Sequence, residues 1–404
     1  MTIEYRPALR KDWQQFGNIV ALSHGDQPDT DQGSIDWWNS FFDEVSTVAA
    51  FDGEEMVGTS LSFTRNTTIP GGGQLPAALV TNIAVVTTHR RQGLLTNMLH
   101  DLLKSANERG EPISTLWSSE SLIYGRFGYG MAGQHYLAKV KSNKAKLVRL
   151  PKISGAVKLT NRNRIREIGP EIWKNSALLH PGMPERTSFG WKSYGSPDSV
   201  KDESLFFASY EENGKSEGYV AYSTSKTPDE DINIHLKELI ATTDAAHAAL
   251  WQFILSIDLV EEVTDLYMPQ DDPLWWMLED PRHLKRTAYD AIWLRILDVE
   301  RVLSARTYSA MCDVVIQIED DFCEWVAGSY RLTVNASGNG TVTRTTSAAD
   351  VTASAEALAT CYFGNAKFSD LARAGLVEEM TPGTLRNLDL AFVSEREPWC
   401  PLMY

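Results

Sequence analysis

The chain has 404 residues, too many for one typical domain, and this length predicts two or three. With 43% hydrophobic and 23% charged residues, its composition excludes disordered and fibrous classes and supplies an ample core. The net charge of −15 argues against general nucleic-acid or anionic-membrane binding and permits attraction of cationic ligands, although an acidic surface also serves solubility.

Cysteine and histidine spacing gives no sign of a metal. The four cysteines lie far apart without a C-x-x-C pair, and the eight histidines show no metal-ligand spacing, so we predict neither a metal nor a disulfide framework. The sequence does not begin with a charged and then apolar leader, and no apolar run approaches the ~20 residues of a membrane span. We therefore expect a cytoplasmic protein without membrane or nucleic-acid partners.

The first 63 residues predict a strand at 3–8, an amphipathic helix at 12–22 and a hairpin of strands 47–51 and 56–63. Between helix and hairpin lie a polar loop with Asp26 and an aromatic helical stretch with Asp36 and Trp37. Most of these aromatic residues fit a helix core. Acids beside tryptophan also suit a cationic amine, through charge and cation–π attraction, so Asp26, Asp36 and Trp37 are candidate substrate residues.

Residues 78–103 form the central stretch of the first half. A short β-branched run at 78–86 predicts a buried strand, and apolar residues at helical spacing from Leu94 predict a helix. The turn between them contains Arg90, Arg91, Gln92 and Gly93. Free N–H groups at a helix start, two cations and a glycine suit a phosphate, although a solvated basic turn has the same composition.

A second segment, 115–130, reads as a strand that ends at Ser118 and Ser119, followed by an aromatic turn with glycines that begins at Tyr124. On composition alone, packed aromatics in a turn are the simpler interpretation.

After a basic linker near Lys144 the order of elements repeats, with a strand at 235–241 and an apolar helix at 250–259. If Ala249 is set against Gly93, Ala246 and His247 replace the arginines. A repeat without the anion-binding turn predicts a structural role. From about residue 286 a third region predicts strands at 314–318, 328–334 and 340–345 and helices at 354–362 and 368–374, and the tail 398–404 is apolar and stiffened by prolines.

Two motifs carry a resemblance. The strand, Arg90-Arg-Gln-Gly93-Leu-Leu95 and the helix resemble the acyl-CoA-binding motif of GNAT acetyltransferases, from which Leu95 departs. The string His-Arg-Arg-x-Gly-Leu-Leu and the segment from Ser119 to Gly130 are similar to the Eis family, whose closing sterol-carrier-like module the third region resembles. The resemblance covers essentially the whole chain. It implies a mixed α/β (α+β) chain with an active GNAT domain at 1–145, a degenerate one at 146–288 and a sterol-carrier-like domain at 289–404.

The resemblance also assigns roles. Tyr124 would be the general acid and the C-terminal carboxylate of Tyr404 the general base, delivered from the third domain. A phenol of pKa ~10 protonates a thiolate of pKa ~8.5 at a cost of about 2 kcal/mol, whereas a carboxyl of pKa ~3.5 is a mismatched base unless burial raises it or a water intervenes. Acetyl-CoA would contact Ile83, Ala84, Val85, Arg90, Arg91, Gln92, Gly93, Leu94, Leu95, Thr96, Ser119 and Glu120.

The expected activity is acetyl-CoA-dependent N-acetylation of a polycationic amine, an aminoglycoside antibiotic acetylated at several amines, by direct transfer in a ternary complex of a homohexameric enzyme. Met403 stands where some relatives carry an acid, which leaves the acceptor open. Acetylation of a polyamine or of a peptide or protein lysine is an alternative. A non-catalytic acyl-CoA or lipid-binding module is an alternative of another class.

Overall fold

The computed structural model describes residues 3–28, 39–40, 42–193, 205–227 and 231–404. The chain forms two compact units. The first unit contains Met1–Ala132, Ile292–Ser394 and Met403–Tyr404, and the second contains Gly133–Ala291 and Glu395–Leu402. Among the described residues, no helix has both the length and the apolar character needed to cross a bilayer.

The first unit opens with a sheet of β1 (Ile3–Arg6), β3 (Ala49–Asp52), β4 (Glu55–Thr68), β5 (Gln74–Val85) and β6 (Ile113–Leu116), in that order, with β2 (Val45–Thr47) on β4. All pairs are antiparallel except β5 with β6. Helix α1 (Trp13–His24) packs on Ala49 and Phe51, while α3 (Leu94–Glu108) packs on Ala50 and Val57. Because neighbouring strand residues point to opposite faces, the two helices cover opposite faces of the sheet. The predicted strand at 3–8, helix at 12–22, hairpin, strand at 78–86 and helix from Leu94 are confirmed. Of the predicted aromatic helical stretch, residues 35–38 and 41 lie outside the described residues.

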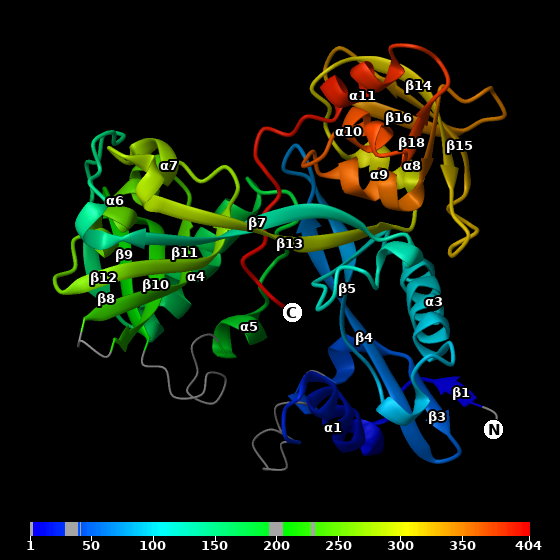
Figure 1. The fold of residues 1–404 in the computed structure, drawn as a ribbon, viewed down its shortest axis with the longest axis horizontal. Helices are drawn as coiled ribbons and strands as arrows, with labels where there is room; N and C mark the ends of the chain where they lie inside the picture. Colours follow the sequence, from blue (N-terminus) through cyan, green and yellow to red (C-terminus); the bar gives the residue numbers. More distant parts are fainter. Residues whose placement is uncertain (1–2, 29–38, 41, 194–204, 228–230) are drawn as a thin grey trace. The chain divides into compact units, whose positions relative to one another are not determined.

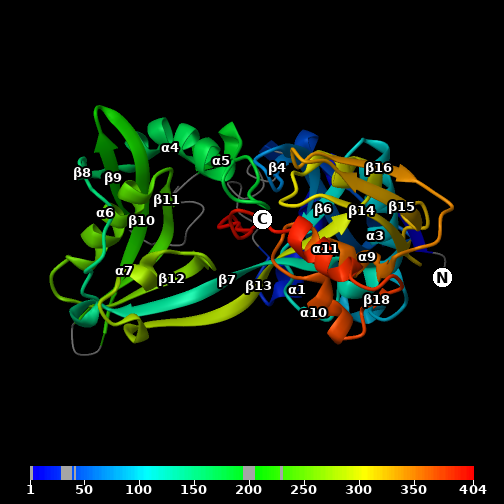
Figure 2. The same ribbon diagram turned by 90° about the horizontal axis from the view of Figure 1, so that it is seen from above.

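The second unit repeats this order with β8 (Ala156–Thr160), α4 (Arg162–Ala177), β9 (Phe206–Glu212), β10 (Lys215–Lys226), β11 (Ile232–Ala241), α6 (Asp244–Leu255) and β12 (Val260–Pro269). Here too one strand pair, β11 with β12, is parallel. Helices α4 and α6 pack on alternate residues of β10, so they cover opposite faces of the sheet (Figure 2). Short helices α5 (Ser188–Ser193) and α7 (Leu274–Met277) are added to the repeat.

One prediction about this repeat was wrong. The helix expected at 250–259 begins at Asp244, six residues earlier, and its N-cap is Thr243. Gly93 is the N-cap of α3, so its counterpart is Thr243, and Ala249 lies in the middle of α6.

The two units exchange a strand. In the first, β6 pairs with residues 293–296 of β13 (Leu284–Ile296), which follows the second repeat. In the second, β12 pairs with residues 135–141 of β7 (Gly130–Lys141), which follows the first repeat. With exchanged strands, a division into compact units differs from a division along the chain, so the boundaries at 145 and 288 stay a prediction.

The third region completes the first unit (Figure 1). Its sheet has the order β16 (Gly340–Arg344), β15 (Gly328–Val334), β14 (Cys312–Glu319), β17 (Val351–Ser354) and β18 (Val377–Glu379). Helices α8 (Val299–Ala305), α9 (Ala355–Tyr362), α10 (Phe368–Arg373) and α11 (Thr384–Ala391) accompany it. The predicted strands and helices are confirmed. The guanidinium of buried Arg306 donates to the carbonyl oxygens of Tyr362 and Phe392, which ties α9 to the end of α11.

Candidate active site

A pocket of about 900 Å³ in the first unit brings the two sequence motifs together. It lies where β5 ends, α3 begins and the chain leaves β6. The predicted cofactor and acid residues that line it are Ile83, Ala84, Val85, Arg90, Arg91, Gly93, Leu94, Leu95, Thr96, Ser119, Glu120 and Tyr124. Gln92 belongs to the same turn, where its side-chain amide donates to the carbonyl of Thr88 at 3.4 Å.

The pocket exists because β5 and β6 separate. Strand β5 pairs with β4 along its whole length, as far as Val85, but in the described chain it pairs with β6 only over Ala77–Leu79. A bulge at Asn82, whose φ is +52°, bends the strand at the point of separation, and Thr59 Oγ1 donates to its carbonyl at 2.9 Å. The edge of Ile83–Val85 that faces away from β4 is therefore available to a ligand that pairs as a strand.

The start of α3 is arranged for an anion. Gly93 is the N-cap with φ of +83°, and Arg91 has φ of +61°, so the turn folds back on itself before the helix. No described side chain caps the helix, and its first turn carries no acid. The free N–H groups of Leu94, Leu95 and Thr96 and the helix dipole thus meet two arginines in one pocket.

Tyr124 is a buried phenol at the other side of this pocket. Its side chain is 7% exposed, and burial raises its pKa to about 12, so the hydroxyl stays protonated at neutral pH. Its ring meets that of Tyr129 edge-on, with 5.9 Å between centroids. The neutral phenol can donate a hydrogen bond to an atom that becomes negative in the pocket.

The third region supports the turn that carries Tyr124. Gly128 adopts φ of +74° and accepts from Arg295 Nη1 at 3.3 Å, and an added Cβ would lie 2.1 Å from that nitrogen. At Gly130 an added Cβ would lie 2.3 Å from the carbonyl oxygen of Glu356 in α9. These two positions need glycine because β13 and α9 approach the turn so closely.

The last residue of the chain lies in the first unit. The hydroxyl of Tyr404 donates to Thr115 Oγ1 at 2.6 Å, and its ring meets that of Phe63 edge-on at 5.9 Å. Tyr404 thereby contacts β4 and β6, the strands on either side of β5.

Of the three predicted substrate residues, only Asp26 lies in the part of the chain that the structure describes, and it does not line the pocket. Asp26 is exposed just after α1, its N–H donates to the carbonyl of Ala21 at 3.0 Å, and it is not among the residues that line the pocket. Asp36 and Trp37 lie outside the described residues. The part of the chain that the structure describes contains no cluster of His, Cys, Asp or Glu suited to a metal ion.

Among the described residues that line the pocket, sequence reasoning missed five: Ser23, His24, His89, Ile123 and Arg126. His89 and Arg126 lie inside the two motifs and could have been included. Nothing in the sequence near Ser23 and His24 signalled their place, because the fold alone brings the end of α1 to the start of α3.

Comparisons with known proteins agree with this geometry. Models of acetyltransferase (GNAT) domains match residues 4–132 and 182–296, and a sterol carrier protein domain model matches 299–401. An N-acetyltransferase of Streptomyces avermitilis, described as uncharacterized, is 32% identical over 412 residues, which cover 99% of each chain. The N-acetyltransferase Eis of Mycobacterium tuberculosis is 29% identical over 98% of each chain. The crystal structure of Eis1 from Mycobacterium abscessus matches all of both chains with a TM-score of 0.86 and 28% identity.

The chain belongs to the Eis family of GNAT N-acetyltransferases. As an Eis-family protein it is an N-acetyltransferase with tandem GNAT domains followed by a sterol-carrier-like domain, as the resemblance implied.

Proposed function

We propose that this Eis-family enzyme transfers the acetyl group of acetyl-CoA to amines of a polycationic acceptor, with aminoglycosides as the first candidates, by direct transfer in a ternary complex. The observation that carries the proposal is the single pocket in which an open strand edge, an uncapped helix start with two arginines and a buried neutral phenol meet.

The chain's residues fit acetyl-CoA as cosubstrate. The open edge of Ile83–Val85 would pair with the pantetheine amides, and its N–H groups would polarise the thioester carbonyl. The pyrophosphate would lie at the start of α3, where the N–H groups and the side chains of Arg90 and Arg91 supply positive charge. Ser119 and Glu120 would border the same cosubstrate.

Tyr124 would donate to the sulfur as the leaving thiolate forms. The carboxylate of Tyr404 would receive the proton of the attacking amine. A free α-carboxyl has a pKa of ~3.5, far below the ~10.4 of an alkyl ammonium, so we propose that the Tyr404 carboxylate acts through a water or orients the amine unless its surroundings raise its pKa. By the same resemblance we propose a homohexamer, with the third domain supplying this carboxylate.

The acceptor is proposed from the family and from the net charge of −15. A polycation is attracted by such a surface at low ionic strength, whereas a neutral peptide is not. Polyamine and lysine acceptors therefore belong in the same assay.

The test is release of the CoA thiol from acetyl-CoA in the presence of kanamycin, neomycin, spermidine or a lysine peptide. Three proteins are compared: the native chain, a chain extended by several residues after Tyr404, and a chain extended equally before Met1. We expect turnover with the aminoglycosides, loss of turnover in the C-terminal extension and retention in the N-terminal one. Equal turnover in all three would refute the terminal carboxylate as the base. Retained CoA binding without turnover on any amine would refute the enzyme and favour the binding module.

A further inference from the structure

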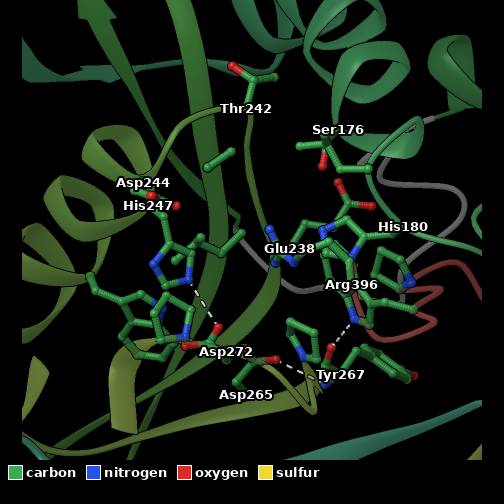
Figure 3. A pocket seen from close by; sticks show the side chains of 18 of the residues that line it. Ser176, His180, Glu238, Thr242, Asp244, His247, Asp265, Tyr267, Asp272 and Arg396 are labelled. Carbon is green, nitrogen blue, oxygen red and sulfur yellow. Dashed lines mark hydrogen bonds and ion pairs between the residues drawn. The ribbon is translucent and has the colours of Figure 1, made fainter. Parts of the chain in front are cut away.

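The second unit contains a counterpart of the pocket in the first. Strands β11 and β12 run in parallel register from Ile232 and Val260 as far as Leu236 and Asp265 and separate beyond that point, as β5 and β6 do. A cavity of about 80 Å³ lies where they separate, bordered by β11, the start of α6, β12 and the end of α4 (Figure 3). The pocket of the first unit is bordered by the equivalent elements, β5, α3, the segment after β6 and the end of α1.

This second cleft is not built for an anion. The hydroxyl of Thr243 accepts from the N–H of Ala246, which occupies one of the free donors at the helix start. Asp244 adds a carboxylate to the first turn of α6, where the first unit has arginines just before α3. A phosphate at this position would meet a capped helix and a negative charge.

The cleft instead receives the C-terminal tail of the same unit. Arg396, Trp399 and Pro401 border the cavity together with residues of β11 and β12. In Figure 3, Arg396 extends from the red tail toward the part of the cavity bordered by His180 and Tyr267. The tail therefore lies where a cosubstrate lies in the proposed pocket of the first unit.

Hydrogen bonds from Arg396, Glu397 and Trp399 hold the tail in the cleft. Arg396 Nε donates to Asp271 Oδ2 at 2.6 Å, and the N–H of Glu397 donates to the same oxygen at 3.3 Å. Trp399 donates from Nε1 to the carbonyl of Tyr267 at 2.5 Å and from its N–H to the carbonyl of Pro181 at 2.9 Å. Trp399 is 7% exposed, so the segment is packed as well as hydrogen-bonded.

We propose that the cleft of the second unit is a receptor for the chain's own tail, residues 396–401, and that Asp271, through Arg396, positions the terminal carboxylate of Tyr404. This proposal rests on the proposed function, in which that carboxylate is the base. Only Met403 separates Leu402, the last tail residue of the second unit, from Tyr404. Two residues reach at most ~7 Å, so the position of Leu402 limits where the carboxylate can lie. Asp271 is thus a positioning residue, since it acts through the tail.

The experiment is a double-mutant cycle on the full-length chain. Asp271→Asn removes the charge that holds Arg396, and the second change is the extension after Tyr404. We expect Asp271→Asn alone to lower kcat about tenfold, because a partly buried ion pair loses one partner, with KM for acetyl-CoA and CoA affinity unchanged. In the extended chain the same substitution should cause no further loss of the residual turnover. Glu279→Gln, which breaks the exposed pair with Lys146 in the same unit, is the matched control and should leave kcat unchanged.

The outcomes separate this proposal from the one on which it rests. Full turnover of the extended chain would refute the terminal base itself. If the extended chain is inactive but Asp271→Asn has wild-type kcat, the positioning role is wrong and the base stands. An equal loss of kcat from Asp271→Asn in both backgrounds would show a merely structural role and overturn the proposal. If Asp271→Asn does not fold, Arg396→Gln takes its place, and Arg396→Lys should restore most of kcat because it keeps the charge.

Discussion

Replacing Tyr124 with phenylalanine removes one hydroxyl from the pocket and tests how the leaving thiolate is stabilised. Burial raises the pKa of Tyr124 to about 12, whereas a thiol has a pKa of ~8.5. Complete proton transfer from this phenol to the sulfur would therefore be uphill by about 5 kcal/mol. A hydrogen bond to a charged acceptor is worth about 1.5–3 kcal/mol, and we take this as the larger usable contribution. Tyr124→Phe should then lower kcat by about 10- to 100-fold.

The assay is steady-state thiol release with a saturating amine, combined with the affinity for CoA measured by calorimetry. We expect kcat to fall and CoA affinity to stay within about twofold, because a hydrogen bond made to the leaving sulfur acts in the transition state. The matched control is Tyr129→Phe, which removes the nearby hydroxyl that bonds Ser114 Oγ at 2.7 Å and does not line the pocket. Its kcat should match that of the native enzyme.

The dependence of kcat on pH tests whether Tyr124 stays protonated while it acts on the leaving sulfur. Because the pKa of Tyr124 is raised, the phenol keeps its proton throughout pH 6–9. The pH dependence of kcat in that range should therefore be the same in the native and Tyr124→Phe enzymes. Native turnover in Tyr124→Phe with intact CoA binding would refute the acid role.

Three further predictions concern the anion site and the buried charges. Gly93→Asp should abolish CoA binding in calorimetry, because it brings a carboxylate to the helix start, while Gly214→Asp, with a similar positive φ of +78° and equally open space in the second unit, should bind CoA normally. Asp265→Asn should raise the unfolding temperature at pH 8 but not at pH 4. Burial raises the pKa of Asp265 from 3.8 to about 7, so the folded state favours the protonated acid. The resulting contribution to the free energy of unfolding, up to about 4 kcal/mol, is present below pH ~4 and is lost as the pH rises through 7. An unchanged pH dependence of unfolding would contradict this. Arg295→Met should destabilise the first unit by about 3–5 kcal/mol, because it leaves the carboxylate of Asp320 buried without the guanidinium of Arg295. If urea unfolding shows that the free energy of unfolding falls by less than about 1 kcal/mol, this prediction is wrong.

The part of the pocket that we propose for the cosubstrate could be located because its residues are local in sequence. Arg90 to Thr96 are neighbours in one turn and helix, so composition and helical spacing located the turn and the helix start, while their role toward the cosubstrate came from the resemblance and stays a prediction. The rest of the pocket was not predictable in the same way. Asp26 was chosen for its charge beside an aromatic stretch, but it is not among the residues lining the pocket, while His24, two residues earlier, lines it. That difference depends on where α1 ends against α3, which no local pattern encodes.

The register of the second repeat was misjudged because its helix start is almost uniformly small and apolar. Alanines at 245, 246, 248 and 249 gave no contrast between a turn and a helix, and the apolar run from Leu250 was taken as the beginning. The missed signal was Thr243 followed by Asp244, an N-cap residue and an acid in the first turn. The exchange of β7 and β13 was also beyond sequence reasoning, since the apolar pattern of a strand indicates which face is buried and not which strand it pairs with.

The two clefts lie at equivalent places in the two repeats, and they differ in the residue at the start of the helix. In the first unit Gly93 offers no side chain to the helix, so the N–H groups of α3 remain for a ligand and the arginines lie beside them. In the second, Thr243 satisfies a donor from within the chain, and Asp244 supplies the charge that an anion would otherwise bring. A cleft closed to phosphate in this way is still an opening between separating strands, and an empty opening costs packing contacts. The tail narrows this opening, because Trp399 borders the remaining cavity of about 80 Å³ and belongs to the same core cluster as residues of α4 and β10. A repeat without the anion site thereby keeps a packed core.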